Sequence, residues 1–263
     1  MSGDSSSFHL LDPRIQRYIW TEGWTELRDA QEMAIPPIVA ADRDVIIAAA
    51  TAAGKTEAAF LPALTHLLKT EPLNGLIVYI SPLKALINDQ FGRLDKLCED
   101  LGIPVCPWHG DISATLKAKF LKDPRGVLLI TPESVEALLC NRGTSVSSTF
   151  SRTAYFVIDE LHAFIGSERG KQMQSLLHRI EKAVGRRVPR IGLSATLGDM
   201  RLASDFLRPG LGEKVVLVES KSAHAELKIM VKGYEEPAVP ARQATRDDET
   251  EEEEDSITPA QVA

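Results

Sequence analysis

The sequence has few cysteines and no long apolar run. Its 263 residues include three cysteines, Cys98, Cys106 and Cys140, which make neither an even disulfide set nor a CxxC metal motif. No segment approaches the roughly 18 uninterrupted apolar residues of a membrane span. The first residues, MSGDSSSFHLLDPR, lack the basic start and apolar core of a secretory signal. We therefore expect a cytoplasmic protein that does not associate with membranes.

The sequence also lacks a basic surplus. The formal net charge is −7, but residues 235–255 hold ten acidic residues against two arginines. That balance of −8 leaves the rest of the chain at +1. The remainder neither indicates nor excludes a nucleic-acid partner, because a nearly neutral domain can carry a basic groove.

Short apolar runs that do not alternate with polar residues recur along the chain. These runs are residues 44–49, 75–81, 103–108, 126–131, 154–159, 190–196 and 214–219. The pattern is typical of strands buried on both faces. Stretches with helical spacing separate most of them, for example 56–68, 84–101 and 170–184. The sequence therefore predicts an α/β domain over residues 1–220, with a mainly parallel sheet of about seven strands and helices on both faces. An antiparallel or mixed sheet is the alternative.

Polar segments follow six of the apolar runs. They are AATAAGKT, SPLK, HGD, TPES, DELH and SAT. Parallel strands place all their carboxyl ends at one edge of the sheet, where ligands bind. We therefore expect these six segments to lie along one edge and to form the functional site.

The segment AATAAGKT, residues 49–56, has the form of a phosphate-binding loop. A strand, a loop and a helix start point backbone N–H groups and the positive helix end at an anion. Lys55 then reaches the β- and γ-phosphates, and the Thr56 hydroxyl holds Mg²⁺. The expected nucleotide-binding residues of the loop are Thr51, Ala52, Ala53, Gly54, Lys55 and Thr56. Ala49 and Ala52 stand where glycine is usual, which is tolerable if their φ angles are negative. A plain helix start with an exposed lysine is the alternative.

Two adjacent carboxylates, Asp159 and Glu160, end the apolar run AYFVID. Burying such a pair is costly unless a cation or hydrogen bonds compensate for it. We predict that Thr56 and Asp159 hold Mg²⁺ and that Glu160 positions and deprotonates the attacking water. A strand-end acid pair that simply meets solvent is the alternative.

Taken together, the motifs AATAAGKT, SPLKAL, TPES, DELH and SAT resemble those of the DEAD/DEAH-box helicases of superfamily 2, in order and in approximate spacing. SPLKAL, TPESVEALL and VIDELHAFIGSERG are most similar to the Lhr-type (large helicase-related) branch. The resemblance covers about residues 10–235. It implies a RecA-like three-layer domain over residues 1–220, with a Q-motif-like helical region starting near residue 10. It also implies ATP and Mg²⁺ as cofactors.

The resemblance implies roles for further residues near the nucleotide. Gln31, in GWTELRDAQ, matches the glutamine that reads the adenine edge; a surface glutamine at a helix start is the alternative. An upstream aromatic residue usually stacks on the base, and Phe8, Tyr18 and Trp20 all remain candidates. His162, Ser194 and Thr196 match residues that couple the ATP site to movement of the nucleic acid.

The resemblance also implies sequence-independent contacts with a DNA or RNA backbone. The matching residues are Pro82, Lys84, Thr131, Pro132 and Glu133. The HGD segment at 109–111 lies in the comparable loop between them. For each segment alone, a helix cap is the simpler reading, and Thr131-Pro132 fits capping chemistry well.

The 67 residues after Thr196 are too few to form a second motor domain of this kind. Residues 221–257 are acidic and poor in large apolar groups, so we expect a disordered linker. Residues 258–263 contain the capping pattern Thr-Pro-Ala-Gln and predict the start of a further helix. We therefore expect a DExH-type helicase motor domain that needs a second RecA-like domain, in cis or in trans, for full hydrolysis and unwinding. The alternatives are a stand-alone ATP-dependent switch completed by a partner protein, and a binding-only protein.

Overall fold

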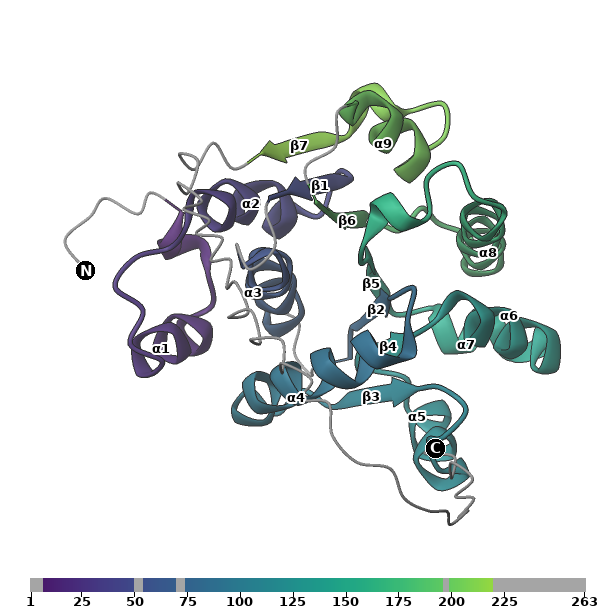
Figure 1. Ribbon diagram of the computed structural model, residues 1–263. Helices are drawn as coiled ribbons and strands as arrows, with labels where there is room; N and C mark the ends of the chain where they lie inside the picture. Colours follow the sequence, from purple (N-terminus) through teal and green to yellow (C-terminus); the bar gives the residue numbers. More distant parts are fainter. Residues whose placement is uncertain (1–6, 50–53, 70–73, 196–198, 220–263) are drawn as a thin grey trace, which may run out of the picture. The chain divides into compact units, whose positions relative to one another are not determined.

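The computed structural model describes residues 7–49, 54–69, 74–195 and 199–219 (Figure 1). The chain divides into two units, Met1–Ala223 and His224–Ala263. The second unit lies outside the described residues, so the predictions for 221–257 and 258–263 are not tested. Thr51, Ala52, Ala53 and Thr196 lie outside the described residues as well.

The first unit is built on a sheet of seven strands in the order β3-β4-β2-β5-β6-β1-β7, and every pairing between them is parallel. The strands are β1 Val45–Ala48, β2 Leu76–Ile80, β3 Val105–Trp108, β4 Gly126–Ile130, β5 Thr153–Ile158, β6 Arg190–Ser194 and β7 Val216–Glu219. The predicted fold class is confirmed, and the antiparallel alternative is wrong. Strand β3 starts two residues later than predicted, after Pro104, whose ring nitrogen cannot donate to the ladder. Strand β7 follows a 3₁₀ turn, Gly212–Lys214.

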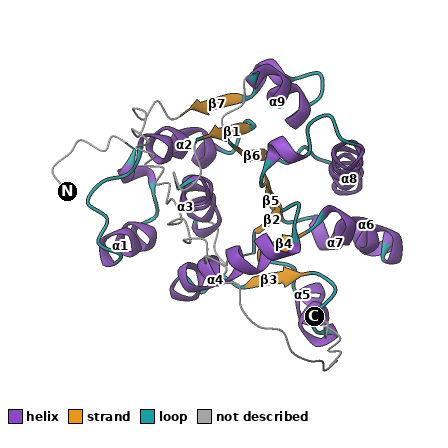
Figure 2. Ribbon diagram, in the orientation of Figure 1, coloured by secondary structure: helices purple, strands orange, loops and turns teal. Residues whose placement is uncertain are grey.

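Helices cover both faces of this sheet (Figure 2). One face carries α1 Pro13–Thr21, α2 Asp29–Ala40, α3 Lys55–Leu68 and α4 Lys84–Asp100. The other carries α5 Ala114–Lys122, α6 Pro132–Asn141, α7 Val146–Phe150, α8 Glu168–Val184 and α9 Met200–Leu207. Successive strand residues enter opposite clusters: Ile47 packs with the first group of helices and Ile46 with the second. Both are fully buried, which is why the strands read as continuous apolar runs.

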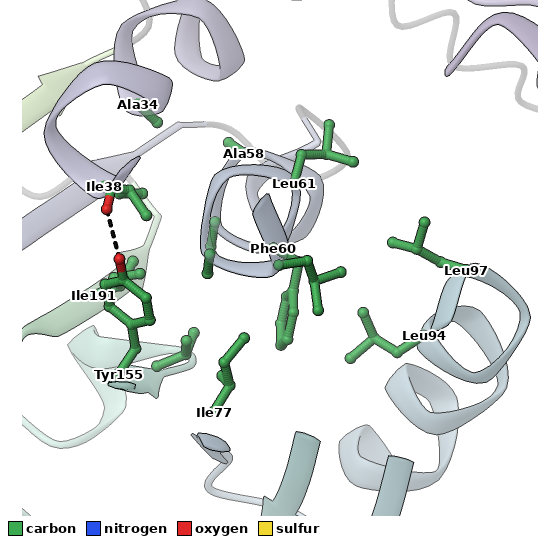
Figure 3. Packing of buried hydrophobic residues seen from close by; sticks show 14 of the residues in the cluster. Ala34, Ile38, Ala58, Phe60, Leu61, Ile77, Leu94, Leu97, Tyr155 and Ile191 are labelled. Atoms are coloured by element: carbon green, nitrogen blue, oxygen red, sulfur yellow. Dashed lines mark hydrogen bonds between the residues drawn. The ribbon is translucent and has the colours of Figure 1, made fainter. Parts of the chain in front are cut away.

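Helix α3 is the central element of the first face (Figure 3). Its Phe60 is fully buried, and the Phe60 ring lies 5.8 Å from the ring of Tyr79 on β2. Burying such a side chain contributes about 1.5–3 kcal/mol. On the neighbouring helix, the carbonyl of Ile38 accepts a 2.6 Å hydrogen bond from the hydroxyl of Tyr155 on β5. These contacts fix the helix that starts at the phosphate loop against the centre of the sheet.

A network of buried ion pairs lies at the edge of the sheet where the strands begin, opposite the edge formed by their carboxyl ends. Asp44, just before β1, is fully buried and accepts hydrogen bonds from Arg208 Nε at 2.7 Å and Nη2 at 2.8 Å. The backbone N–H of Arg190 donates to the same carboxylate at 2.9 Å. Glu181 of α8 accepts from both arginine side chains at 2.9 Å, and Arg187 also pairs with Asp44. The network joins β1, β6, α8 and the end of α9.

None of the helices in the described part of the chain combines the length and apolar character needed to cross a membrane. All three cysteines are free thiols. Cys98 and Cys106 are buried, and burial raises the pKa of Cys98 to about 12.

Candidate functional site

The polar segments that follow the strands meet at one edge of the sheet. Hydrogen bonds continue the parallel ladders just past the strand ends. Ala49 N donates to Ser194 O at 3.3 Å, and Asp159 N donates to Ile80 O at 2.9 Å. Ser81 N likewise donates to Ile130 O at 3.1 Å. The ladders therefore hold the starts of the loops after β1, β2 and β5 at a common level.

A cleft of about 690 Å³ lies at this edge. The start of α3, the two acids after β5, the loop before α2 and one side of α4 all contribute to its wall. Its lining includes Trp24, Gln31, Gly54, Lys55, Thr56, Asp159 and Glu160. The cleft thus brings together the predicted nucleotide-binding residues that the structure describes, the residues predicted to be catalytic, Lys55 and Glu160, and the predicted magnesium ligands, Thr56 and Asp159.

Gly54 and Gln31 lie close together in the cleft wall. Gly54 is the N-cap of α3 with a φ of +76°, a left-handed conformation that favours glycine. A Cβ atom at this position would lie 2.6 Å from Nε2 of Gln31. Gln31 is 3% exposed, and its Oε1 accepts a 2.9 Å hydrogen bond from the backbone N–H of Arg28. Gln31 does stand at a helix start, as the alternative has it, but it is buried rather than at the surface, and its amide lies beside Gly54.

Lys55 lies at the first position of α3, and its ammonium donates to the carbonyl of Ala49 at 2.8 Å. The side chain thus reaches back to the residue that follows β1. Among the described residues, only Ala41 and Glu160 combine a side chain with a positive φ. Ala49 is not one of them, so the replacement of the usual glycine causes no backbone strain at this position.

Asp159 is the buried member of the acid pair. It is 7% exposed and accepts a hydrogen bond from the Tyr79 hydroxyl. Burial raises the pKa of its carboxyl, although the bond from Tyr79 and the charge of Lys55 act in the opposite direction. A buried carboxylate in the same cleft as the Thr56 hydroxyl suits a hard cation such as Mg²⁺, because both groups offer the oxygen ligands that it prefers.

Glu160 and His162 link the acid pair to the end of β6. Glu160 has a left-handed backbone, with a φ of +46°, and its side chain is 37% exposed. His162 Nδ1 lies 3.3 Å from Glu160 Oε2 and 3.5 Å from Ser194 Oγ. The structure thus brings together the two described members of the predicted coupling set, His162 and Ser194, around the Glu160 carboxylate.

The loops after β2 and β3 form a second polar region. Pro82 is buried, whereas Lys84 is exposed at the first position of α4 and pairs with Asp111 of the HGD segment. His109 of the same segment is 5% exposed, and its Nε2 lies 2.9 Å from Asn88 Oδ1. Two of the predicted nucleic-acid motifs are thus neighbours, as the shared edge of the sheet requires.

The TPES segment caps α6. The Thr131 hydroxyl accepts a 3.3 Å hydrogen bond from Ser134 N, and Pro132 occupies the first turn. The segment therefore forms the helix cap expected from its sequence alone. The start of the helix remains available to an anion. Glu133 accepts two hydrogen bonds from Arg169, one of them from Nη2 at 2.9 Å. The negative charge of Glu133 is therefore already paired.

Sequence reasoning missed two residues of this edge, Trp24 and Tyr79. Trp24 lines the cleft, whereas none of Phe8, Tyr18 and Trp20 is among its lining residues. Trp24 lies in the quoted segment GWTELRDAQ, seven residues before Gln31, and this proximity could have identified it. Tyr79 sits inside the apolar run LIVYI, where nothing in the local pattern marks it as functional.

Comparison with known proteins gives consistent matches. The sequence model of the DEAD/DEAH box helicase family matches residues 28–203. An ATP-dependent helicase Lhr-Core from Sulfolobus acidocaldarius is 30% identical over 228 residues, which are 81% of this chain and 26% of that protein. The structure of Mycobacterium smegmatis helicase Lhr bound to ssDNA and AMP-PNP has a TM-score of 0.67 at 26% identity, covering 80% of this chain and 28% of that chain. DUF1998 helicase MrfA bound to DNA and AMPPNP gives a TM-score of 0.68 at 26% identity, covering 80% and 29%.

The chain spans about a quarter of the length of the first curated relatives it matches. The matched region includes the phosphate loop, DELH and SAT. These matches confirm the predicted resemblance, including its Lhr-type character, and they confirm the α/β fold.

Proposed function

The chain belongs to the DEAD/DEAH box helicase family, and on that premise we propose that it acts as the first motor domain of an ATP-dependent nucleic-acid helicase. In this role it binds Mg-ATP in the cleft and a nucleic-acid strand across the neighbouring loops. One observation carries the proposal. The helix start at Gly54–Thr56 and the acid pair Asp159–Glu160, far apart in sequence, line the same cleft.

The phosphates of ATP bind at the start of α3. This helix has 14 residues, so its N-terminus offers unpaired N–H groups and a partial positive charge. Lys55 exchanges the Ala49 carbonyl for the phosphate oxygens, a charge-assisted contact that is stronger than the bond it replaces.

Thr56 and Asp159 are the residues that hold Mg²⁺ in this proposal. Bound Mg²⁺ neutralises charge on the β- and γ-phosphates. Glu160, more exposed than Asp159, orients the attacking water and accepts its proton. His162 lies 3.3 Å from the Glu160 carboxylate and fixes its direction, and the nearby Ser194 connects the pair to β6.

The adenine binds in the same cleft, near the loop before α2. Gln31 carries the amide that reads the base edge, and its buried position beside Gly54 supports this role. Trp24 replaces the three upstream aromatic residues as the candidate for stacking on the base, because it lines the cleft and they do not.

The nucleic-acid backbone contacts the loops after β2 and β4. Lys84 supplies a charge, and Thr131 with the start of α6 supplies hydroxyl and N–H donors. Glu133 contributes through Arg169, which it orients, since a free carboxylate would repel a phosphate. These groups address phosphates and sugars, so the proposed binding is independent of sequence and open to DNA or RNA.

A second RecA-like domain, in cis or in trans, completes the motor in this proposal. Helicases of this kind close two domains around ATP, and arginines of the second domain stabilise the charge on the transferred phosphoryl group. The chain alone should therefore bind Mg-ATP but turn it over slowly. Its three free cysteines fit the proposed cytoplasmic location.

Binding and hydrolysis by the 263-residue chain test the proposal. We expect a fluorescent ATP analogue to bind in the presence of Mg²⁺, and Lys55→Ala to abolish this binding. Lys69→Ala, at the other end of α3, should leave it unchanged. Glu160→Gln should bind normally. Turnover should stay near background with or without single-stranded DNA or RNA. Fast, strand-stimulated turnover that Glu160→Gln abolishes would contradict the need for a second domain.

A further inference from the structure

Tyr79 is the one polar side chain of β2, and it points at the acid pair. The strand reads LIVYI, and each of its residues is buried. Tyr79 pairs in register with Val157 of β5, so Asp159 lies two residues further along on the same face of the sheet. The Tyr79 hydroxyl donates a hydrogen bond to Asp159 Oδ2.

Packing alone does not explain a tyrosine at this position. A phenylalanine would fill the same space among Ile77, Leu129 and the other apolar residues of this cluster. A buried hydroxyl needs a partner, and here the partner is the carboxylate expected to hold a cation. The hydrogen bond restricts rotation of the carboxylate, so that its oxygens face one direction.

The ring of Tyr79 also contacts the helix that carries the other proposed ligand. It packs 5.8 Å from the ring of Phe60 at an interplanar angle of 43°. Phe60 belongs to α3, the helix whose second residue is Thr56. One side chain therefore contacts both elements that supply the proposed ligands, Asp159 through its hydroxyl and α3 through its ring.

We propose that Tyr79 is a positioning residue for the cation-bound nucleotide, because its phenol sets the orientation of the Asp159 carboxylate opposite Thr56. The inference rests on the proposed function, which assigns Thr56 and Asp159 to Mg²⁺. Residues that orient metal ligands typically change metal affinity or activity by about 10- to 100-fold when they are replaced.

The test uses Tyr79→Phe in the 263-residue chain. A fluorescent ATP analogue is bound at increasing Mg²⁺ and, separately, in EDTA. We expect Tyr79→Phe to raise the Mg²⁺ concentration at half-saturation about tenfold or more, with binding in EDTA unchanged. A merely structural role would weaken both conditions alike.

Tyr155→Phe is the matched control. Tyr155 is equally buried on the adjacent strand, but its hydroxyl donates to the backbone carbonyl of Ile38 (Figure 3). The control loses a comparable hydrogen bond and should keep the wild-type Mg²⁺ requirement. A second variant, Phe60→Leu, removes the ring that braces Tyr79 and should raise the requirement in the same direction by a smaller factor.

The Asp159→Asn variant separates the possible failures. If Asp159→Asn loses the Mg²⁺ dependence while Tyr79→Phe and Phe60→Leu keep the wild-type value, the positioning role is overturned and the proposed function stands. If the wild type itself shows no Mg²⁺-dependent binding, the proposed function fails. In the double variant Tyr79→Phe/Asp159→Asn, we expect no effect beyond that of Asp159→Asn alone.

Discussion

Replacing Asp44 with asparagine should lower the free energy of unfolding by about 3 kcal/mol. Removing one partner of a buried ion pair costs about 3–5 kcal/mol, because the other charge is left uncompensated. Asp44 is fully buried and holds Arg208 at 2.7 and 2.8 Å. Arg208 keeps its 2.9 Å contact with Glu181 in the variant, which favours the lower end of that range. For a domain of this size, the loss corresponds to a fall of roughly 6–12 °C in the unfolding midpoint.

Asp42→Asn is the control for this prediction. Asp42 lies two residues earlier and makes a 3.0 Å ion pair with Arg43, but both side chains are 54% exposed. We expect no measurable change from Asp42→Asn, since exposed pairs contribute little. Urea unfolding followed by far-UV circular dichroism gives both values, with the slope unchanged if only stability differs. If the two variants unfold at the same urea concentration, the network contributes no net stability and packing alone holds this edge.

The stability difference between wild type and Asp44→Asn should also depend on pH. Burial is the largest single effect and acts to raise the pKa of Asp44. The hydrogen bonds and charge of Arg208, the backbone N–H of Arg190 and the charge of Arg187 together outweigh it and lower the pKa below its ordinary value. A depressed folded-state pKa means that the stabilisation is complete above the unfolded value of about 3.9 and is lost as the pH falls through the folded value. The difference between wild type and Asp44→Asn should therefore be widest at neutral pH and should narrow below about pH 4.

Three further variants test the cleft and the nucleic-acid loops. Gly54→Ala should weaken Mg-ATP binding about 5- to 30-fold in equilibrium titrations. A residue with a side chain pays about 1–2 kcal/mol to adopt the left-handed backbone conformation, and the new Cβ would lie 2.6 Å from Gln31 Nε2. Trp24→Ala should raise the Kd for ATP, with about 1–3 kcal/mol lost from stacking, and leave binding of inorganic tripolyphosphate unchanged. Lys84→Ala should weaken single-stranded DNA binding and reduce its log–log salt slope by about 0.7. Lys96→Ala, an exposed lysine paired with Glu22 at 2.9 Å, should do neither.

The fold could be predicted because a parallel sheet leaves a distinctive pattern. Ile46 and Ile47 point to opposite faces and both are fully buried, so the run cannot alternate with polar residues. The strand ends were less predictable. Strands β3 and β7 start later than the apolar runs that predicted them, after Pro104 and after a 3₁₀ turn, respectively. A count of apolar residues does not reveal either effect.

The strand pattern predicts only the part of the site whose residues lie directly after the strands, whereas the prediction of Gln31 on α2 comes from the family resemblance. Parallel topology then brings segments such as Gly54–Thr56 and Asp159–Glu160 together without further information. Trp24 and Tyr79 are different, because tertiary structure decides their roles. The path of the chain between α1 and α2 selects Trp24 over the more distant aromatic residues. The register between β2 and β5 places Tyr79 beside Asp159.

Asp44 and Asp159 lie at opposite edges of the sheet, and their pKa values are shifted in opposite directions. Arg208 and its neighbours compensate Asp44, whereas burial raises the pKa of Asp159, which has a tyrosine rather than an arginine as its side-chain partner. A raised folded-state pKa means that the ionised Asp159 carboxylate destabilises the folded chain at neutral pH. In the function that we propose, a bound cation would compensate this charge.

Asp159→Asn should therefore raise the unfolding midpoint in nucleotide-free buffer that contains EDTA, because it removes a buried charge and keeps an oxygen for the Tyr79 hydroxyl. The same variant should lose the further rise that Mg-ATP gives the wild type, since binding stabilises only the state that binds. Differential scanning fluorimetry measures both effects on one sample series, with Asp44→Asn beside it. If Asp159→Asn instead lowers the metal-free unfolding midpoint, as Asp44→Asn does, then the Asp159 carboxylate stabilises the metal-free fold. That result would contradict our assignment of Asp159 as a destabilising carboxylate that serves to bind the cation.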